Sequence, residues 1–195
     1  MAARLRCVRC QRPLSHCLCS LIPSLSSRVQ VQILQHPDEA RHALNTARLA
    51  VLGLERANLC LGEQFPHLPI DSGTYLLFPG PEARSLKELT LAEQTAVERL
   101  IVLDGTWRKA RKLLYLNPAL QALPQLKLPE GCRSRYRVRK APLPDALSTL
   151  EAIVIALSLI ERSERFEALL VPFEALIEGQ IAAMGTEVYQ RNHGC

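Results

Sequence analysis

Four of the seven cysteines in this chain of 195 residues lie close together near the N-terminus. Cys7, Cys10, Cys17 and Cys19 have the spacing C-x2-C-x6-C-x-C. A CxxC turn can place two thiolates on one cation, the CxC pair can supply two more, and four sulfur ligands in a tetrahedron suit zinc best. Because four protein ligands leave no open coordination position, the spacing predicts a structural zinc site and not a catalytic one.

Other interpretations of this cluster are a redox-active dithiol or four free thiols, which a lone CxxC would leave open. Arginines among the cysteines favour the thiolate form, which is the form that binds metal. His16 is a possible substitute ligand, but four cysteines already complete the shell, so we expect it to be a neighbour. Cys60, Cys132 and Cys195 show no ligand spacing, and we predict that they are ordinary thiols, mostly buried.

A second candidate for chemistry is Asp104, which follows the apolar run at residues 100–103. Gly105 and Thr106 come next, and then Trp107, the only tryptophan in the chain. A short, wholly apolar run is typical of a buried central strand, and in parallel sheets ligands bind beyond the carboxyl ends of the strands. Asp104 is therefore either a catalytic carboxylate or the cap of the following helix. Trp107 is either a core residue or a flat stacking surface beside the acid.

The positive charge of the chain is concentrated in two blocks, although the net charge is only +5. Residues 1–28 hold five basic and no acidic side chains, and residues 108–140 hold ten basic and one acidic side chain. The remaining stretches carry a net negative charge. Localised basic surface indicates a polyanionic partner, with nucleic acid as the first candidate, and a solvated face is the alternative.

Nine basic side chains of the second block are predicted to bind the phosphates of RNA. They are Arg108, Lys109, Arg111, Lys112, Arg133, Arg135, Arg137, Arg139 and Lys140. The alternating arginines from residue 133 to 139 would lie on one side of an extended segment, where they would follow a phosphate backbone. The alternative is a loop with solvated charges.

The elements that must position these residues alternate between strands and helices. Hydrophobic periodicity predicts strands at residues 29–34, 57–61, 74–78, 100–103 and 126–128. It predicts helices at residues 40–52, 90–99, 105–115, 148–162 and 173–184. This alternation indicates an α/β fold with a mostly parallel sheet over residues 29–195. A four-cysteine module precedes it at residues 1–28 and ends in a linker at residues 22–27.

The composition is that of a globular protein, with 48% apolar and 22% charged residues. This excludes disordered and low-complexity classes. The N-terminus lacks the apolar segment of a secretory signal, and the longest strongly apolar stretch, near residues 152–160, is too short to cross a bilayer. We therefore expect a cytoplasmic protein without membrane association, in which disulfides are disfavoured. No obligate protein partner is evident.

The chain resembles the DTW-domain proteins, which are tRNA-uridine aminocarboxypropyltransferases, over nearly its whole length. Each matching block is weak alone, but together in this order they are specific. The blocks are the four cysteines with Pro13, His36 and Pro37 with Glu39, Asn45 and Thr46, Phe78 to Gly80, Asp104 with Thr106 and Trp107, and Ser148 and Thr149 with Glu151 and Ala152.

This resemblance implies an enzyme that transfers the 3-amino-3-carboxypropyl group of S-adenosylmethionine to N3 of a uridine in tRNA. The variable loop is the expected position, and methylthioadenosine is the co-product. The implied fold is related to the SPOUT methyltransferases, with a knotted C-terminal half that holds the cofactor. Alternatives are the same transfer onto ribosomal RNA, a methyltransferase, and a non-catalytic zinc-containing RNA-binding protein.

Roles for individual residues follow from this chemistry. Asp104 is the candidate general base for the N3 proton, with Thr106 and Trp107 as further catalytic residues. The expected cofactor-binding residues are Leu103, Ser148, Thr149 and Glu151, although Ser148 and Glu151 also have the spacing of a capping box. A further wall of the site is expected from His36, Glu39, Asn45 and Thr46, for which turn and helix-start roles are the alternatives.

Overall fold

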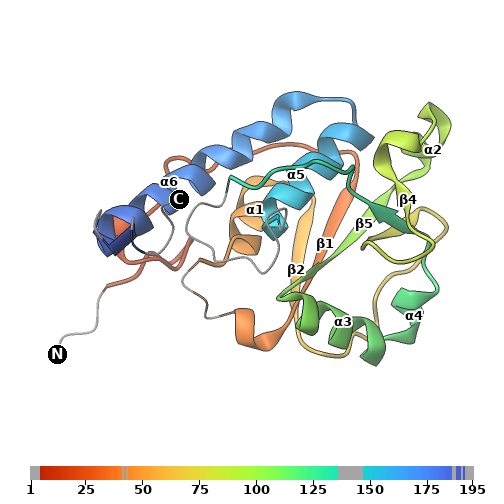
Figure 1. Cartoon of the computed structure of the whole chain (residues 1–195), viewed down its shortest axis with the longest axis horizontal. Coiled ribbons are helices and arrows are strands. Elements are labelled where there is room, and N and C mark those ends of the chain that lie inside the picture. Colours follow the sequence, from red (N-terminus) through yellow and green to blue (C-terminus); the bar gives the residue numbers. More distant parts are fainter. Residues whose placement is uncertain are drawn as a thin grey trace.

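The computed structural model describes residues 5–40, 42, 44–135, 147–185, 188–189 and 191. A six-stranded sheet forms the centre of this described part, in the order β2-β1-β5-β3-β6-β4 (Figure 1). All paired strands are parallel, which confirms the expected α/β fold with a parallel sheet. The strands are β1 (Gln30–Gln35), β2 (Ala57–Leu61), β3 (Thr74–Leu77), β4 (Arg84–Ser85), β5 (Arg99–Asp104) and β6 (Gln125–Lys127).

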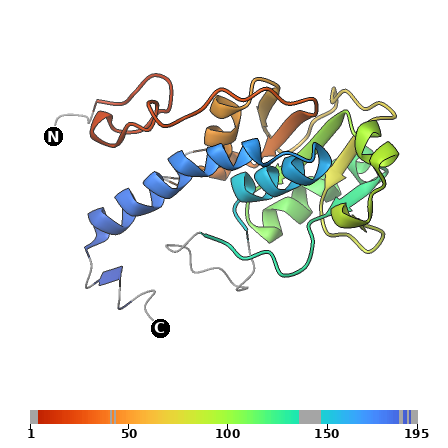
Figure 2. The ribbon, with the colours of Figure 1, turned by 90° about the horizontal axis from the view of Figure 1, so that it is seen from above.

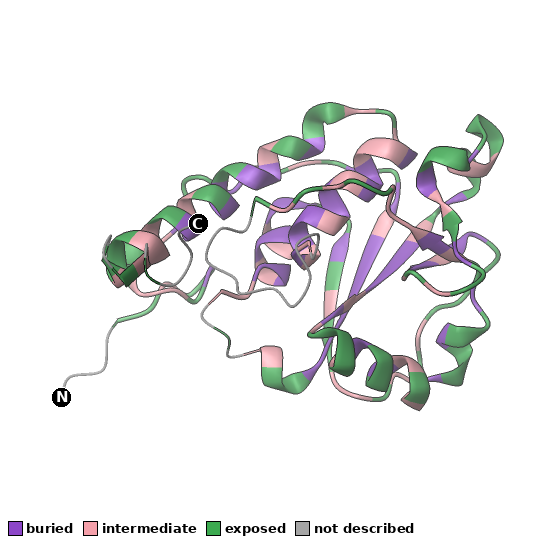
Figure 3. Ribbon diagram, in the orientation of Figure 1, coloured by how far each residue is buried: buried purple, intermediate pink, exposed green. Residues whose placement is uncertain are grey.

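Helices cover both faces of the sheet. The helices are α1 (Ala47–Gly53), α2 (Leu91–Ala96), α3 (Trp107–Leu116), α4 (Pro118–Gln121), α5 (Thr149–Ile160) and α6 (Leu170–Met184). One apolar cluster joins α1, α5 and α6 to Val31, Ile33 and Val102. A second joins α3 and α4 to Leu34 and Ile101 on the other face. Figure 3 shows the central strands buried between these layers.

The register of β1 and β5 sets the position of the candidate acid. Each residue of β1 pairs with one of β5, so Gln35 lies directly beside Asp104 at the carboxyl edge of the sheet. The apolar residues Leu100, Ile101 and Val102 are buried in the centre of β5. The buried strand predicted from the apolar run is therefore confirmed, and Asp104 ends it.

Two helices are shorter than their periodicity predicts. The helix predicted over residues 40–52 begins only at Ala47, after a short 3-10 turn at Pro37–Glu39. The side chains of His36 and Asn45 accept hydrogen bonds from the backbone amides of Asp38 and Arg48, and such local bonds compete with helix formation before that point. The helix predicted over residues 90–99 ends at Ala96, because the backbone amide of Arg99 already donates to Gly73 beside β5.

The N-terminal segment packs against the main core. Cys10, Leu18 and Ile22 belong to the same buried cluster as α1, α5 and α6. Leu25, in the predicted linker, forms a parallel bridge to Leu54, which follows α1. Figure 2 shows this segment continuing directly into β1. The domain boundary at residue 28 stays a prediction.

The resemblance predicts a knotted C-terminal half, and the chain of that half includes the path from β6 to α5. That path includes residues 136–146, which are outside the described residues, so the knot stays a prediction.

No described helix is both long enough and apolar enough to cross a membrane.

Candidate active site and metal centre

The carboxylate of Asp104 is held from two sides at the carboxyl edge of the sheet. The side chain is only 9% exposed. Gln35, the last residue of β1, donates from Nε2 to Oδ2 at 2.6 Å. Thr149, the first residue of α5, donates from its hydroxyl to Oδ1. Three segments far apart in the sequence therefore fix the orientation of this one carboxylate.

Asp104 does not cap the helix that follows it. Thr106 is the N-cap of α3, and its hydroxyl accepts a hydrogen bond from the backbone amide of Lys109 at 3.4 Å. The capping alternative for Asp104 is therefore wrong, because the chain advances two residues beyond the strand before the helix begins. The capping role belongs to Thr106 instead, whose hydroxyl stabilises the first turn of α3.

A cavity of about 700 Å³ lies at the carboxyl ends of β3, β5 and β6. Both chain neighbours of Asp104, Leu103 and Gly105, line it, as does its hydrogen-bond partner Thr149, but Asp104 itself is not among the described lining residues. The cavity walls come from residues 77–79, 126–132 and 147–149, together with Leu103, Gly105 and Trp107. Most of these side chains are apolar, and the hydroxyls of Ser148 and Thr149 are among the polar groups. The volume lies within the usual range for small-molecule sites.

Trp107 lies at this cavity and is not a core residue. Its side chain is 39% exposed. Its ring meets that of Phe78 edge to face, with the centroids 6.0 Å apart and the planes at 67°. Both rings line the cavity. An aromatic pair here offers a flat apolar surface to a planar ligand.

The buried carboxylate of Glu151, in the first turn of α5, binds Ser134 and Arg135 in the segment that follows β6. It is 4% exposed and accepts a hydrogen bond from the backbone amide of Ser148 at 2.7 Å, which completes the capping box. It also accepts from the hydroxyl of Ser134 at 3.0 Å and from the backbone amide of Arg135 at 2.6 Å. Leu103, Ser148 and Thr149 line the cavity, whereas Glu151 is not among its lining residues.

The four expected wall residues lie on the other side of Asp104, after β1. The backbone amide of His36 donates to the carbonyl of Asp104 at 3.1 Å. His36 Nε2 lies 2.9 Å from Glu63 Oε1, and Glu39 is paired with Lys109 at 2.7 Å. The hydrogen bond that Lys109 donates to the Glu39 carboxylate raises the pKa of Lys109.

The other two wall residues have local roles. Asn45 Oδ1 accepts a hydrogen bond from the backbone amide of Arg48, and Thr46 is buried at the start of α1. None of the four wall residues is among the described residues that line the cavity.

Among the described residues, three of the predicted RNA-binding cations take part in ion pairs. Lys109 binds Glu39, Lys112 binds Glu63 at 2.8 Å, and the guanidinium of Arg135 binds Glu174 at 2.8 Å. The hydrogen bond from Lys112 lowers the pKa of Glu63. The side chains of Arg108, Arg111 and Arg133 are exposed. Arg137, Arg139 and Lys140 lie outside the described residues.

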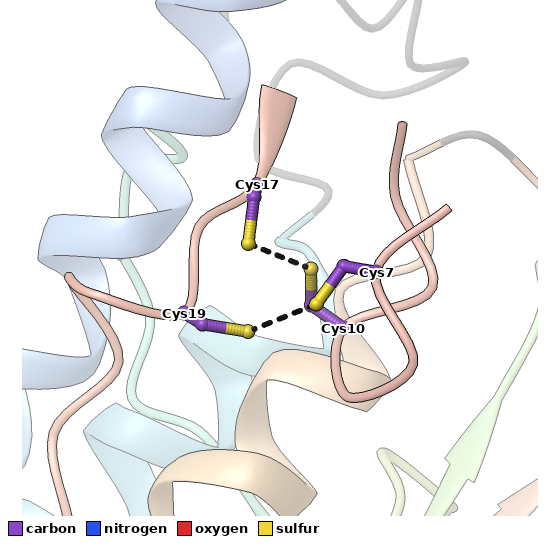
Figure 4. Close-up of side chains that lie close together, drawn as sticks. All are labelled: Cys7, Cys10, Cys17 and Cys19. Atoms are coloured by element: carbon purple, nitrogen blue, oxygen red, sulfur yellow. Dashed lines mark hydrogen bonds between the residues drawn. The ribbon is translucent and has the colours of Figure 1, made fainter. Parts of the chain in front are cut away.

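The four N-terminal cysteines converge as their spacing predicts. Figure 4 shows Cys7, Cys10, Cys17 and Cys19 pointing toward one another. Their Sγ atoms all lie within 4.8 Å of one another, with 3.5 Å from Cys7 to Cys19 and 3.8 Å from Cys10 to Cys17. A zinc–sulfur distance of about 2.3 Å gives a tetrahedron with edges of about 3.8 Å, so the four thiols fit zinc. His16 is not part of this cluster and contacts Ser15 instead.

The environment of these thiols favours a shared cation. Hydrogen bonds from the backbone amides of Cys10 and Arg9 lower the pKa of Cys7 to about 6. Burial and the neighbouring thiols raise the pKa of Cys19 to about 12. The guanidinium of Arg9 donates to backbone carbonyls, so backbone amides and not arginine charges lower the Cys7 pKa. A bound divalent cation would allow all four thiols to ionise.

The prediction that the remaining cysteines are mostly buried is wrong for the two that the structure describes. Cys60 is exposed, because β2 is the edge strand of the sheet and its last two residues face solvent. Cys132 is partly exposed and lines the cavity. Cys195 lies outside the described residues.

Sequence reasoning missed Gln35 and the loop that follows β6. Gln35 directly precedes the His36 and Pro37 pair, but only its register with β5 places its amide on Asp104. Residues 128–132 line the cavity and carry no motif that would identify them.

A comparison of the sequence with models of known protein families identifies one family. The model of the DTW domain matches residues 4–181 of this chain. The chain belongs to the DTW-domain family. The resemblance noted from the sequence blocks is thus confirmed. No solved structure matches the chain.

Several curated relatives have the name tRNA-uridine aminocarboxypropyltransferase. Type 2 of Macaca fascicularis is 35% identical over 191 residues, covering 91% of this chain and 64% of the relative. Type 2 of Drosophila melanogaster is 33% identical over 192 residues, covering 91% and 76%. Type A of Arabidopsis thaliana is 25% identical over 190 residues, covering 80% and 72%. The chain of this DTW-domain protein thus spans 64% of the length of the macaque relative.

The cysteine cluster predicts one metal ion per chain. Cys10→Ser should lower zinc content to near zero and reduce thermal stability, because a hydroxyl is a poor replacement for a thiolate ligand. Elemental analysis and thermal melting measure both effects. The control is Cys60→Ser, which removes an exposed thiol outside the cluster. A wild-type protein that is folded without metal would contradict the zinc site.

The hydrogen bonds that Glu151 accepts predict that a conservative substitution at this position destabilises the protein. Glu151→Gln replaces one acceptor oxygen by an amide NH₂ group. This group would face the N–H donors of Ser148 or Arg135, so the free energy of unfolding should fall by about 2–4 kcal/mol. Urea denaturation measures this loss. Glu174→Gln removes only the exposed ion pair with Arg135 and should cost less than about 1 kcal/mol. Equal effects of the two variants would argue against the role of Glu151.

Proposed function

We propose that this chain transfers the 3-amino-3-carboxypropyl group of S-adenosylmethionine to N3 of a uridine in tRNA. The expected position is the variable loop, and the co-product is methylthioadenosine. The observation that carries the proposal is the buried carboxylate of Asp104, held by two donors. One of these donors, Thr149, and both chain neighbours of Asp104 line a cavity of about 700 Å³. Membership of the DTW-domain family and the names of the curated relatives support the chemistry.

The cavity suits a nucleoside with an amino acid tail. Its apolar walls can enclose an adenosine, and the N-terminus of the 12-residue helix α5 offers a positive end to a carboxylate. Leu103, Ser148 and Thr149 would contact the donor, and Glu151 would hold Ser134 and Arg135, which follow the cavity-lining residues 126–132. When bound, S-adenosylmethionine supplies an electrophilic carbon and a neutral thioether as leaving group. The knotted path of the SPOUT-related fold belongs to this proposal.

Asp104 supplies the base for the reaction. N3 of uridine is a weak acid, and its proton passes to the Asp104 carboxylate. The electron pair left on N3 forms the new bond to carbon, and the pair of the broken carbon–sulfur bond goes to sulfur. Gln35 and Thr149 keep the carboxylate in one orientation for this transfer. Holding N3 and the electrophilic carbon in line would also lower the activation barrier.

Other residues hold the uridine and the RNA. Trp107, packed edge to face on Phe78, offers a stacking surface at the cavity, and Thr106 positions it by capping α3. His36 and Glu39, with Asn45 and Thr46, would brace the far side of Asp104.

The exposed arginines at positions 108, 111 and 133 are the described candidates for phosphate contacts, and the predicted contacts of Arg137, Arg139 and Lys140 remain part of the proposal. The four-cysteine zinc has a structural role here, and a cytoplasmic location remains a prediction.

The proposed reaction predicts a specific pair of products. The purified protein, S-adenosylmethionine and tRNA that lacks the modification should yield aminocarboxypropyl-uridine and an equal amount of methylthioadenosine. Mass spectrometry of the digested nucleosides and of the small molecules measures both. Methylated uridine, or intact tRNA binding without product, would overturn the proposal.

The role of Asp104 predicts a separation of turnover from binding. Asp104→Asn keeps the shape of the side chain but removes the base, so kcat should fall by about 10²- to 10⁴-fold while tRNA affinity is retained. Single-turnover assays and equilibrium binding measure the two quantities. The control is Asp71→Asn, since Asp71 binds Thr74 and Arg99 at the opposite edge of the sheet. A variant Asp104→Asn with undiminished kcat would show that Asp104 is not the base.

A further inference from the structure

The outward side of α3 carries three cations and one tyrosine in a single stripe. Arg108, Arg111, Lys112 and Tyr115 are all exposed, whereas Ala110 and Leu113 are buried beneath them. The spacing of the four exposed residues is that of one helical face. We call these four residues the α3 face, and Figure 3 shows this side of the helix as exposed.

Tyr115 is unusual on such a surface. Its side chain is 79% exposed, the highest exposure of any aromatic residue among the large exposed hydrophobic side chains of the described chain. Lys112 is held by Glu63, but the helix from Trp107 to Leu116 contains no acidic residue. The α3 face is therefore a positively charged surface with an accessible aromatic ring.

The α3 face begins at the candidate active site. Trp107, the first residue of α3, lines the cavity and contacts Phe78. Tyr115 is eight residues further along the same helix, which corresponds to about 12 Å along its axis. The α3 face is therefore within reach of a strand of RNA whose target base enters the cavity.

Cations next to an exposed aromatic ring are typical of surfaces that bind single-stranded nucleic acid. Arginines bind the phosphates, and an unpaired base of any identity stacks on the ring. We infer that the α3 face binds the unpaired RNA next to the target uridine, with Tyr115 stacking on a neighbouring base and Arg108 and Arg111 on phosphates. The inference rests on the proposed function for its choice of RNA as partner, and it assigns a role to Tyr115 that the transfer reaction alone does not require.

The test compares two variants of Tyr115 in the full chain. Tyr115→Ala should weaken binding of a single-stranded oligouridine and of unmodified tRNA by about tenfold. Tyr115→Phe keeps the ring and should bind as the wild type does. Fluorescence anisotropy at fixed salt measures affinity, and thermal melting shows that both variants are folded. Leu91→Ala, which shortens an exposed side chain on α2, is the control and should change nothing.

Two further measurements separate the roles of the ring and of the charges. Arg111→Gln should reduce the salt dependence of tRNA binding by about one phosphate contact, whereas Tyr115→Ala should leave that slope unchanged. Tyr115→Ala should not weaken binding to a blunt RNA duplex, in which no base is free to stack. In turnover, it should raise KM for tRNA and leave kcat unchanged.

The inference is overturned if Tyr115→Ala binds both RNAs as the wild type does, if Tyr115→Phe is as weak as Tyr115→Ala, or if the wild type binds neither RNA. Failure of the proposed function gives a different result. In that case the wild type makes no aminocarboxypropyl-uridine, yet Tyr115→Ala still weakens its binding to RNA.

Discussion

The hydrogen bonds to the Asp104 carboxylate are the interaction on which the arrangement of this site depends. A buried carboxylate is costly unless donors satisfy it, and here the donors come from the end of β1 and the start of α5. Gln35 can reach Asp104 only in the observed register of β1 and β5. Thr149 can reach it only if α5 begins beside the carboxyl end of β5. The contacts of Asp104 therefore depend both on the register of β1 with β5 and on the position of α5.

The start of α5 serves the fold and the cavity together. Ser148 and Glu151 form the capping box, while Ser148 and Thr149 also line the cavity. Glu151 additionally binds the backbone of Arg135, which follows the cavity-lining residues 126–132. Capping and a place in the cavity wall are combined here, because the end of a helix presents both its cap and its polar groups to the same space.

The basic block at residues 108–140 is partly neutralised by acidic side chains from other parts of the chain. Glu39, Glu63 and Glu174 each neutralise one cation of the basic block. Lys109 and Lys112 thereby connect α3 to the segments after β1 and β2, which braces the edge of the sheet around Asp104. The exposed arginines of α3 remain available on the outward side of the helix. One helix thus uses its charges both to fix its position and to form a surface.

Local patterns determine much of this protein. The apolar run before Asp104 predicts a buried strand, the cysteine spacing predicts the cluster, and the ordered blocks identify the family, because each of these signals lies within a short stretch of chain. The same patterns place α1 wrongly at its start, since side-chain hydrogen bonds of His36 and Asn45 outweigh its periodicity.

Only the tertiary structure decides which distant side chains meet. The contact of Gln35 with Asp104, the attachment of Arg135 to Glu151 and the pairing of Lys109 with Glu39 all join segments at least 16 residues apart. Strand order and register set these contacts, and both arise from packing of the whole sheet. A local stretch of sequence can therefore specify an acid at the end of a strand, but the folded chain determines what holds that acid in place.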